Sequence, residues 1–344
     1  MSPSGRRRIV PWATLALLVA SCSPSTPDAS RTAPPDPRLK GSVLGLDRAG
    51  ILTVHELPSR STRRVDLPPS AGSFTEAFWG DDGETLYGMA LERAGGYQLY
   101  RLAETGTAEP VGPPLDAFRY SSPASGTLLV SRCDREGIDG LDVLDLAEPR
   151  EWRRVADGCI GALSPDEQTV AFSPDAVSVW EASVSGGGQP AELLRLTELE
   201  GIPASDGPPR IISEMVWSEG GLAFAVEAGV QTAVVVVRPP GEAAVTVLPD
   251  VGTVFGTQVA WQPGGGLLAI ANRNTRGAVL RVLERSGDLR VVGLNPDFDT
   301  VPIWSPTGDV LLAGSRASWL FIDPDGEWLG GLSGDRSFPK DWGG

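Results

Sequence analysis

The chain has 344 residues, and its acidic residues outnumber the basic ones to give a net charge of −15 at pH 7. Lysine occurs only at positions 40 and 340. Because phosphate backbones and anionic lipid headgroups attract clustered Lys and Arg, this balance argues against nucleic acid as a partner and against adhesion to a membrane by charge. The length allows one large domain besides terminal segments.

The first 21 residues have the pattern of an export signal. Three arginines at positions 6–8 precede an apolar stretch at 9–20, which is shorter than the ~20 residues that span a bilayer. A basic segment, a short apolar segment and small residues in this order are typical of a secretory signal peptide. Cys22 follows directly, and the whole pattern resembles the lipobox of bacterial lipoproteins.

The lipobox resemblance implies cleavage before Cys22, lipidation of Cys22 and anchoring to the cell membrane on its extracytoplasmic side. An ordinary signal peptide with an incidental cysteine is the alternative. Removal of residues 1–21, which carry three arginines and no acid, leaves a net charge of −18. Residues 22–38 are rich in Pro, Ser and Thr and have almost no apolar content, so we expect a disordered tether. Residues 39–344 form the predicted folded domain.

One short phrase recurs along that domain: an aromatic or apolar anchor, a Ser/Pro/Asp/Gly turn, and then an apolar strand. The copies begin with Trp79-Gly-Asp-Asp-Gly, Tyr120-Ser-Ser-Pro, Leu163-Ser-Pro-Asp, Trp217-Ser-Glu-Gly, Trp261-Gln-Pro-Gly and Trp304-Ser-Pro-Thr-Gly. Their anchors lie 41, 43, 54, 44 and 43 residues apart. A period of about 40–45 residues predicts the four-stranded blades of a β-propeller.

These six copies predict six complete blades, and the chain ends supply the parts of a seventh. Segments 42–47, 51–57 and 62–67 alternate in the manner of strands two, three and four of a blade. Trp342 lies 38 residues after Trp304, so the missing first strand is predicted at the C-terminal end. The prediction is therefore an all-β, seven-bladed propeller in which the C-terminal strand closes the first blade. Six blades with loose ends is the alternative.

The repeated phrases resemble those of TolB-type propellers, which are related to WD repeats, although no copy is a complete Trp-Ser-Pro-Asp-Gly. The resemblance covers nearly the whole predicted domain. It implies the fold but leaves the function open, because such relatives serve as envelope scaffolds, as sensors, or beside a hydrolase domain.

Several residue types carry a functional and a structural interpretation. The repeated tryptophans are predicted to fill the interfaces between blades and not to form a binding cage. His55, the only histidine, lies in a predicted strand, and without a Gly-x-Ser-x-Gly elbow we predict no catalytic residue. One histidine and no paired-cysteine motif argue against a metal site. Asp142 and Asp145 are expected to meet solvent.

Cys133 and Cys159 remain after lipidation of Cys22. Cys133 is predicted to end the second strand of one blade and Cys159 to open the next blade, on the same face of the propeller. An exported compartment permits a disulfide between them, and two buried free thiols are the alternative.

Carboxylates give the best functional lead. A polar residue lies shortly before each inner-strand anchor, and it is acidic in every case but one, which is a glutamine. These residues are Glu76, Asp116, Asp157, Glu214, Gln258, Asp299 and Asp341. If these side chains face inward, one mouth of the propeller carries a negative ring that attracts a cation or a basic protein segment. We select Glu76, Asp116, Glu214 and Asp299 as binding residues. In the alternative interpretation they are ordinary surface acids.

One interval exceeds the repeat period. It contains about ten extra residues, which fall in segment 198–210, and such a loop is a second candidate contact. The sequence therefore predicts a lipid-anchored, monomeric, non-enzymatic propeller that binds an unidentified envelope protein without a cofactor. A small-ligand or cation sensor, and an enzyme that uses mouth carboxylates on an envelope carbohydrate, are the alternatives.

Overall fold

The computed structural model describes residues 36–57, 59–103, 107–123, 126–133, 140–239, 241–249, 256–274, 277–295, 302–314, 318–333 and 337–343. These residues belong to one compact unit. The predicted signal peptide, Cys22, residues 22–35 of the predicted tether and Asp299 lie outside the described residues. Across the described ranges, no helix has the length and apolar content that a membrane crossing requires.

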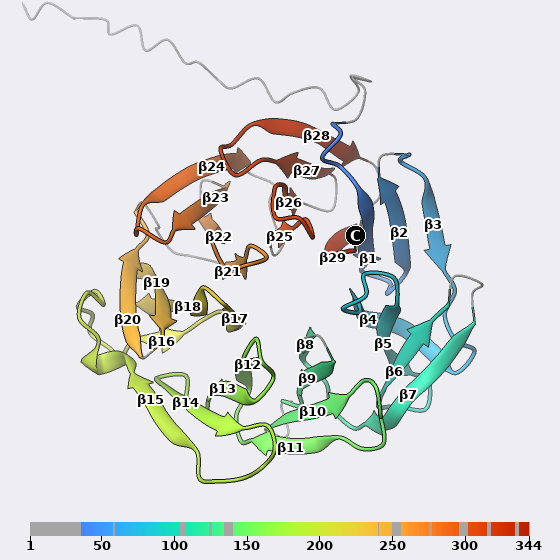
Figure 1. Cartoon of the computed structure of the whole chain (residues 1–344), viewed down its shortest axis with the longest axis horizontal. Coiled ribbons are helices and arrows are strands. Elements are labelled where there is room, and N and C mark those ends of the chain that lie inside the picture. Colours follow the sequence, from blue (N-terminus) through green and yellow to red (C-terminus); the bar gives the residue numbers. More distant parts are fainter. Residues whose placement is uncertain are drawn as a thin grey trace, which may run out of the picture. The chain divides into compact units, whose positions relative to one another are not determined.

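The described strands form seven antiparallel sheets arranged as the blades of a β-propeller (Figure 1). Blade 1 consists of β29 (Ser337–Gly343), β1 (Gly41–Asp47), β2 (Leu52–Leu57) and β3 (Thr62–Val65). Blade 2 consists of β4 (Ala71–Trp79), β5 (Leu86–Glu92), β6 (Tyr97–Leu102) and β7 (Ala108–Leu115). Blade 3 consists of β8 (Tyr120–Pro123), β9 (Thr127–Ser131), β10 (Leu141–Asp145) and β11 (Arg153–Ala156).

Blade 4 consists of β12 (Ile160–Leu163), β13 (Thr169–Ser173), β14 (Ser178–Ser183) and β15 (Ala191–Arg195), and blade 5 of β16 (Arg210–Ile211) with β17 (Val216–Ser218), β18 (Gly221–Ala228), β19 (Gln231–Arg238) and β20 (Glu242–Val247). Blade 6 consists of β21 (Gly256–Trp261), β22 (Leu267–Asn274), β23 (Gly277–Glu284) and β24 (Leu289–Asn295). Blade 7 consists of β25 (Ile303–Trp304), β26 (Leu311–Gly314), β27 (Ser318–Ile322) and β28 (Trp328–Ser333). A short 3₁₀ helix, η1 (Leu196–Glu198), follows β15. The predicted all-β fold and the seven-blade count are confirmed, and the six-blade alternative is wrong.

The C-terminal strand closes blade 1, as predicted. β29 pairs with β1, and Trp342 lies opposite Val43 in the register. The indole Nε1 of Trp342 donates a hydrogen bond to the carbonyl oxygen of Lys40 at 2.7 Å. Because the first and last strands share one sheet, the ring has no free blade edge at the point where the chain begins and ends.

The innermost strands define two faces of the ring. They are β29, β4, β8, β12, the β16–β17 pair, β21 and β25, and they surround the axis (Figure 1). All start on one face, which we name the start face and which contains residues 71–72, 116–119, 198–210 and 337–338. All turn back on the opposite face, which we name the turn face and which contains residues 80–85, 164–168, 262–266 and 305–309. Since the strands alternate in direction, the links between blades return to the start face.

The repeated phrase forms the turn that follows the inner strand in blades 2, 4, 5, 6 and 7. In blade 3 the expected turn is misplaced, because Tyr120-Ser-Ser-Pro is the inner strand β8 itself. Ser164 and Ser305 are buried there, and their Oγ atoms accept hydrogen bonds from the backbone nitrogens of Thr169 (3.0 Å) and Val310 (3.1 Å). The last turn position has a positive φ, for example 76° at Gly308. Blade 4 places Glu167 there with φ 58°, and its Oε1 accepts a hydrogen bond from the backbone nitrogen of Gly126 in blade 3 at 2.9 Å.

The tryptophans pack between blades, which confirms their structural interpretation. Nε1 of Trp304 donates to the carbonyl oxygen of Ala260 in blade 6 at 3.0 Å, and Nε1 of Trp79 donates to that of Ser42 in blade 1 at 3.2 Å. The buried His55 ring also serves packing, because its centroid lies 4.6 Å from that of Trp319 in blade 7.

The expectation that Asp142 meets solvent is wrong. Only 2% of its side chain is exposed. Its two carboxylate oxygens accept hydrogen bonds from Nη1 of Arg132 at 2.9 Å and Nε of Arg154 at 2.6 Å. Two guanidinium groups compensate the loss of hydration, and so a charged side chain can lie inside blade 3. Asp145, in contrast, is exposed.

Candidate functional site

The start face brings charged side chains from several inner strands together around the axis. Lys340 of β29 and Glu76 of β4 form an ion pair, with Nζ and Oε1 3.1 Å apart. Both side chains are only partly exposed, at 28% and 22%. This pair links blades 1 and 2 in the middle of their inner strands, because Glu76 is the sixth of nine residues in β4 and Lys340 the fourth of seven in β29.

Irregular strand pairing places both members of this ion pair. In blade 1, Leu44 lies opposite Asp341 whereas Gly45 lies opposite Pro339, so Lys340 is the extra residue of a β-bulge. In blade 2, the register also shifts between Phe74 and Glu76. A bulge leaves one residue outside the ladder and turns its side chain in a new direction.

Glu214 lies at a larger irregularity, where the inner strand of blade 5 is interrupted between β16 and β17. Ser213 supports the interruption, because its Oγ accepts a hydrogen bond from the nitrogen of Ala225 (2.8 Å) and donates one to the carbonyl oxygen of Glu214 (2.7 Å). Within the described part of the chain, the Glu214 carboxylate has no hydrogen-bond or ion-pair partner.

The electrostatic surroundings of Glu214 are unfavourable for its charge. Loss of hydration raises the pKa of its carboxyl group, and the negative charge of Glu76 raises the pKa further. The positive charges of Lys340 and Arg119 act in the opposite direction. Solvent reaches the side chain, but the surrounding protein displaces much of the water that would otherwise stabilise the carboxylate.

Asp341 is the third acid of this cluster, and it supports the structure. Its Oδ2 accepts a hydrogen bond from the backbone nitrogen of Trp79 at 2.7 Å, and its Oδ1 accepts one from that of Trp342 at 2.8 Å. Burial raises the pKa of this carboxyl group, while the two hydrogen bonds lower it. Asp341 therefore joins the inner strands of blades 1 and 2.

The cluster differs in composition from the predicted acidic ring. The negative charge of Glu76 raises the pKa of both Glu214 and Asp341, but the positive charges of Lys340 and Arg119 lower that of Glu214. Asp116 is 90% exposed, and its Oδ2 lies 3.7 Å from Nη2 of Arg132 in its own blade. Three members of the predicted ring remain. Asp157 forms an ion pair with Arg154, and Gln258 is half-buried in β21. Asp299 lies outside the described residues.

Lys340 and Arg119 were not predicted, because the expected ring consisted of acids and one glutamine. One signal was present, since Lys340 is one of two lysines in the chain. We define the mouth cluster as Glu76, Arg119, Glu214, Lys340 and Asp341. It has one more acid than bases, so it favours a cation only slightly. The described residues contain no group of three or more His, Cys, Asp or Glu side chains that could hold a metal ion.

Cys133 and Cys159 are joined by a disulfide, with sulfurs 2.04 Å apart and Cα atoms 5.5 Å apart. The bond connects the chain after β9 in blade 3 to the chain before β12 in blade 4, on the start face. The Oγ of Ser131 donates a hydrogen bond to the carbonyl oxygen of Cys159 at 3.0 Å, so the same two blades are also joined without the covalent bond.

The 198–210 segment lies on the start face and leads from β15 to β16. Together with the turn between β18 and β19 it borders a cavity of about 620 Å³. The cavity is separate from the mouth cluster, because no member of that cluster lines it.

Comparisons with known proteins identify the fold and no family. No family and no curated protein matches the sequence. Among solved structures, the chain is similar to a periplasmic gluconolactonase from Pseudomonas aeruginosa, with a TM-score of 0.59 and 17% identity over 88% of this chain and 98% of that one. An uncharacterised Listeria monocytogenes protein gives a TM-score of 0.60 with 10% identity over 84% of this chain and 90% of that one.

TolB from Acinetobacter baumannii gives a TM-score of 0.50 and 13% identity over 88% of this chain, which spans 66% of TolB. The neighbours thus include both an enzyme and TolB. At these identities the likeness establishes the propeller fold alone, and function has to be argued from the site.

Proposed function

We propose that this protein is a lipid-anchored, extracytoplasmic propeller that binds a basic segment of another envelope protein at its start face, without catalysis. The observation that carries the proposal is the Glu214 carboxylate. Its side chain is exposed to solvent, partial loss of hydration and the negative charge of Glu76 raise its pKa, and it has no hydrogen-bond or ion-pair partner among the described residues. An incoming lysine or arginine would stabilise its charged form and so gain affinity from this carboxylate.

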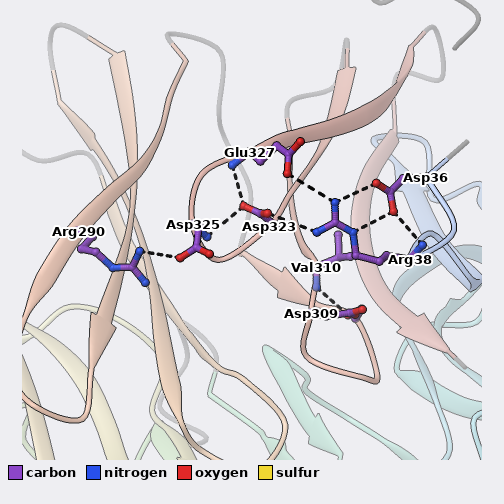
Figure 2. Close-up of polar contacts among 9 residues, drawn as sticks. Asp36, Arg38, Arg290, Asp309, Val310, Asp323, Asp325 and Glu327 are labelled. Carbon is purple, nitrogen blue, oxygen red and sulfur yellow. Dashed lines mark hydrogen bonds and ion pairs between the residues drawn. The ribbon is translucent and has the colours of Figure 1, made fainter.

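The position of the N-terminal segment supports an outward orientation of the start face. Residues 36–40 precede β1, which starts on the turn face. Nε of Arg38 donates to Oδ1 of Asp36 at 2.9 Å, and Nη1 donates to Oδ2 of Asp323 in blade 7 at 3.3 Å (Figure 2). The backbone nitrogens of Asp325 and Glu327 donate to the other oxygen of Asp323, at 3.0 and 2.7 Å.

Because of these contacts, the chain leaves the propeller at a fixed point on the turn face. Residues 23–35 between this point and Cys22 can span at most about 45 Å when extended. A lipid on Cys22 would therefore keep the point where the chain enters the turn face within about 45 Å of the membrane, and this arrangement is compatible with a start face that is open to partners.

In-cell photocrosslinking tests this proposal. A photoreactive residue replaces Arg119 on the start face or, as the matched control, the exposed Arg150 on the turn side of blade 3. We expect one envelope protein to be captured from position 119 and not from position 150. Capture should be lost with Glu214→Lys and should require the lipid anchor, which Cys22→Ala removes. Equal capture from both positions, or capture that survives Glu214→Lys, would refute the proposal.

A second candidate function is enzymatic, and the same carboxyl group favours it. A carboxyl group with a raised pKa near an ionised carboxylate is the arrangement used for general acid–base chemistry on carbohydrates. Hydrolysis of glucono-1,5-lactone is the first assay, since one structural neighbour is a gluconolactonase. Activity that disappears in Glu214→Gln would favour this candidate. Thermal stabilisation by a metabolite or divalent cation, without turnover, would favour the sensor alternative.

A further inference from the structure

The cavity beside the 198–210 segment is a product of the extra residues in that interval. The segment and the β18–β19 turn form its walls, and the lining includes Ser205, Asp206, Pro208, Arg210, Glu227 and Val230. Its volume of about 620 Å³ lies within the range of small-molecule sites.

Small residues keep this space open. Gly229 has a φ of +64°, and a Cβ atom on it would lie 3.1 Å from the Cβ of Ser205. A Cβ on Gly207 would meet nothing within 4 Å. The turn and the loop therefore approach closely at one point and leave the rest of the gap empty.

The polar side chains around the cavity do not pair with one another. Arg210 and Glu227 are opposite each other in the β16–β18 register. Nevertheless, their side chains have no hydrogen-bond or ion-pair partner in the described part of the chain, and the same holds for Asp206 and Gln231. Ser205 is the exception, because its Oγ donates to the carbonyl oxygen of Gly207 at 2.6 Å. Hydrogen-bond donors and acceptors are thus available together on a concave surface.

The charges around the cavity select against a strongly charged ligand. Asp206 and Glu227 would repel an anion, and Arg210 would repel a cation. A hydroxyl group can donate to a carboxylate and accept from a guanidinium at once, so a neutral polyol satisfies both kinds of group. The rim also offers apolar surface at Pro208 and at Val230, which is 78% exposed.

We propose that this cavity binds a neutral, hydroxyl-rich glycan, with Arg210, Glu227 and Asp206 as the hydrogen-bonding residues. The cavity admits a ligand of one or two sugar rings, whose C–H faces would lie against Pro208 and Val230. This site is independent of the mouth cluster and of the proposed protein partner. It gives the propeller a second contact on the start face, with the glycan part of the cell envelope.

Saturation-transfer NMR with the disaccharides chitobiose and maltose tests the proposal on the full-length protein. We expect at least one of the two sugars to bind with a dissociation constant of about 0.1–5 mM. Arg210→Ala and Glu227→Gln should each weaken this binding about tenfold or more. The matched controls are Arg150→Ala and Glu148→Gln, an exposed pair outside the cavity, and they should bind as the unaltered protein does.

Thermal unfolding of each variant separates lost binding from lost folding. Unchanged sugar binding in Glu214→Gln would show that the cavity acts independently of the mouth cluster. The proposal is refuted if neither sugar binds at about 10 mM, or if Arg210→Ala and Glu227→Gln bind as well as their controls.

Discussion

The two faces of the propeller use polar contacts in different ways. On the turn face, contacts join neighbouring blades: Nε2 of Gln262 donates to the carbonyl oxygen of Gly308 at 2.7 Å, and Glu167 accepts from Gly126. A Cβ atom on Gly265 would lie 2.1 Å from the nitrogen of Gly220, so these two turns touch. On the start face, the Cys133–Cys159 disulfide and the Ser131–Cys159 hydrogen bond also join two blades, but the strand interruption in blade 5 leaves the Glu214 carboxylate without a hydrogen-bond or ion-pair partner among the described residues.

This difference suggests a division between stability and binding. A satisfied polar contact between blades stabilises the ring, and an unsatisfied charged group remains available to a ligand. The comparison holds if substitutions on the turn face and in the blade interfaces reduce the free energy of unfolding, while a substitution of Glu214 leaves it nearly unchanged.

Removal of residues 337–344 should have the largest effect. The deletion takes away the inner strand of blade 1 and the Asp341 bridge to blade 2. Loss of the buried Trp342 alone should cost about 3–5 kcal/mol. We expect the shortened protein to lose cooperative unfolding in circular dichroism melts, and a chain that lacks only Gly344 should unfold normally. A cooperative melt of the shortened chain would mean that ring closure is dispensable.

Trp304→Ala should be a highly damaging single substitution. The indole is 6% exposed and bonds to the next blade, so truncation leaves a cavity and an unpaired carbonyl, at about 3–5 kcal/mol. Trp328→Ala is the matched control, since Trp328 is 36% exposed and surface changes cost about 0.5 kcal/mol. Urea denaturation measures both. Equal losses in the two variants would contradict the role assigned to the blade interface.

The disulfide adds stability to the start face, where it joins blades 3 and 4. Replacement of Cys133 and Cys159 by serine should reduce the free energy of unfolding by about 3 kcal/mol. Thiol titration of the mature protein, unfolded without reductant, provides the direct check. We expect no free thiol, and two free thiols would disprove the bond.

The architecture was predictable because each blade needs the same parts. A large anchor such as Trp304 fills one interface and a buried serine such as Ser305 holds the following turn, so the phrase repeats with the blade. Closure was predictable because Trp342 continues that spacing. In both cases the physical requirement is local and recurs along the chain.

The site was predictable only in part. Glu76 and Glu214 could be placed on inner strands, but the bulge at Lys340 and the strand interruption before β17 depend on pairing between strands. No single residue signals such a register shift, so the Lys340–Glu76 pair could not be foreseen. Burial of Asp142 could not be foreseen for the same reason, because it depends on strand pairing. Its partner Arg132 follows β9 and its partner Arg154 lies in β11, and both strands pair with β10.

Glu214→Gln should change binding and pH dependence more than stability. The carboxyl group has a raised pKa in the folded state. The contribution of this group to the free energy of unfolding is therefore most favourable at a pH below its pKa in the unfolded state. It is lost as the pH rises through its pKa in the folded state. The glutamine variant should lack this loss, and its stability at neutral pH should equal or exceed that of the unaltered protein.

Binding of a pentalysine peptide should respond in the opposite sense. Because a cation favours the ionised carboxylate, affinity should fall as acidification protonates Glu214, and the glutamine variant should bind weakly at all pH values. Calorimetry at several pH values measures this, with Asp116→Asn as the matched control. A pH response that persists in Glu214→Gln would assign the titration to another group.

Arg38→Gln should have the smallest effect on stability and a clear effect on one pKa. Hydrogen bonds from Arg38 lower the pKa of Asp36 to about 2 from its ordinary value of 3.8. The associated stability is present above pH 3.8 and is lost as the pH falls toward 2. It should be well under 1 kcal/mol, since the pair is open to solvent. NMR titration of the Asp36 carboxyl carbon should show its pKa rising toward 3.8 in the variant. An unchanged pKa would mean that Arg38 does not fix the exit point of the chain on the turn face, and the proposed outward orientation of the start face would lose its support.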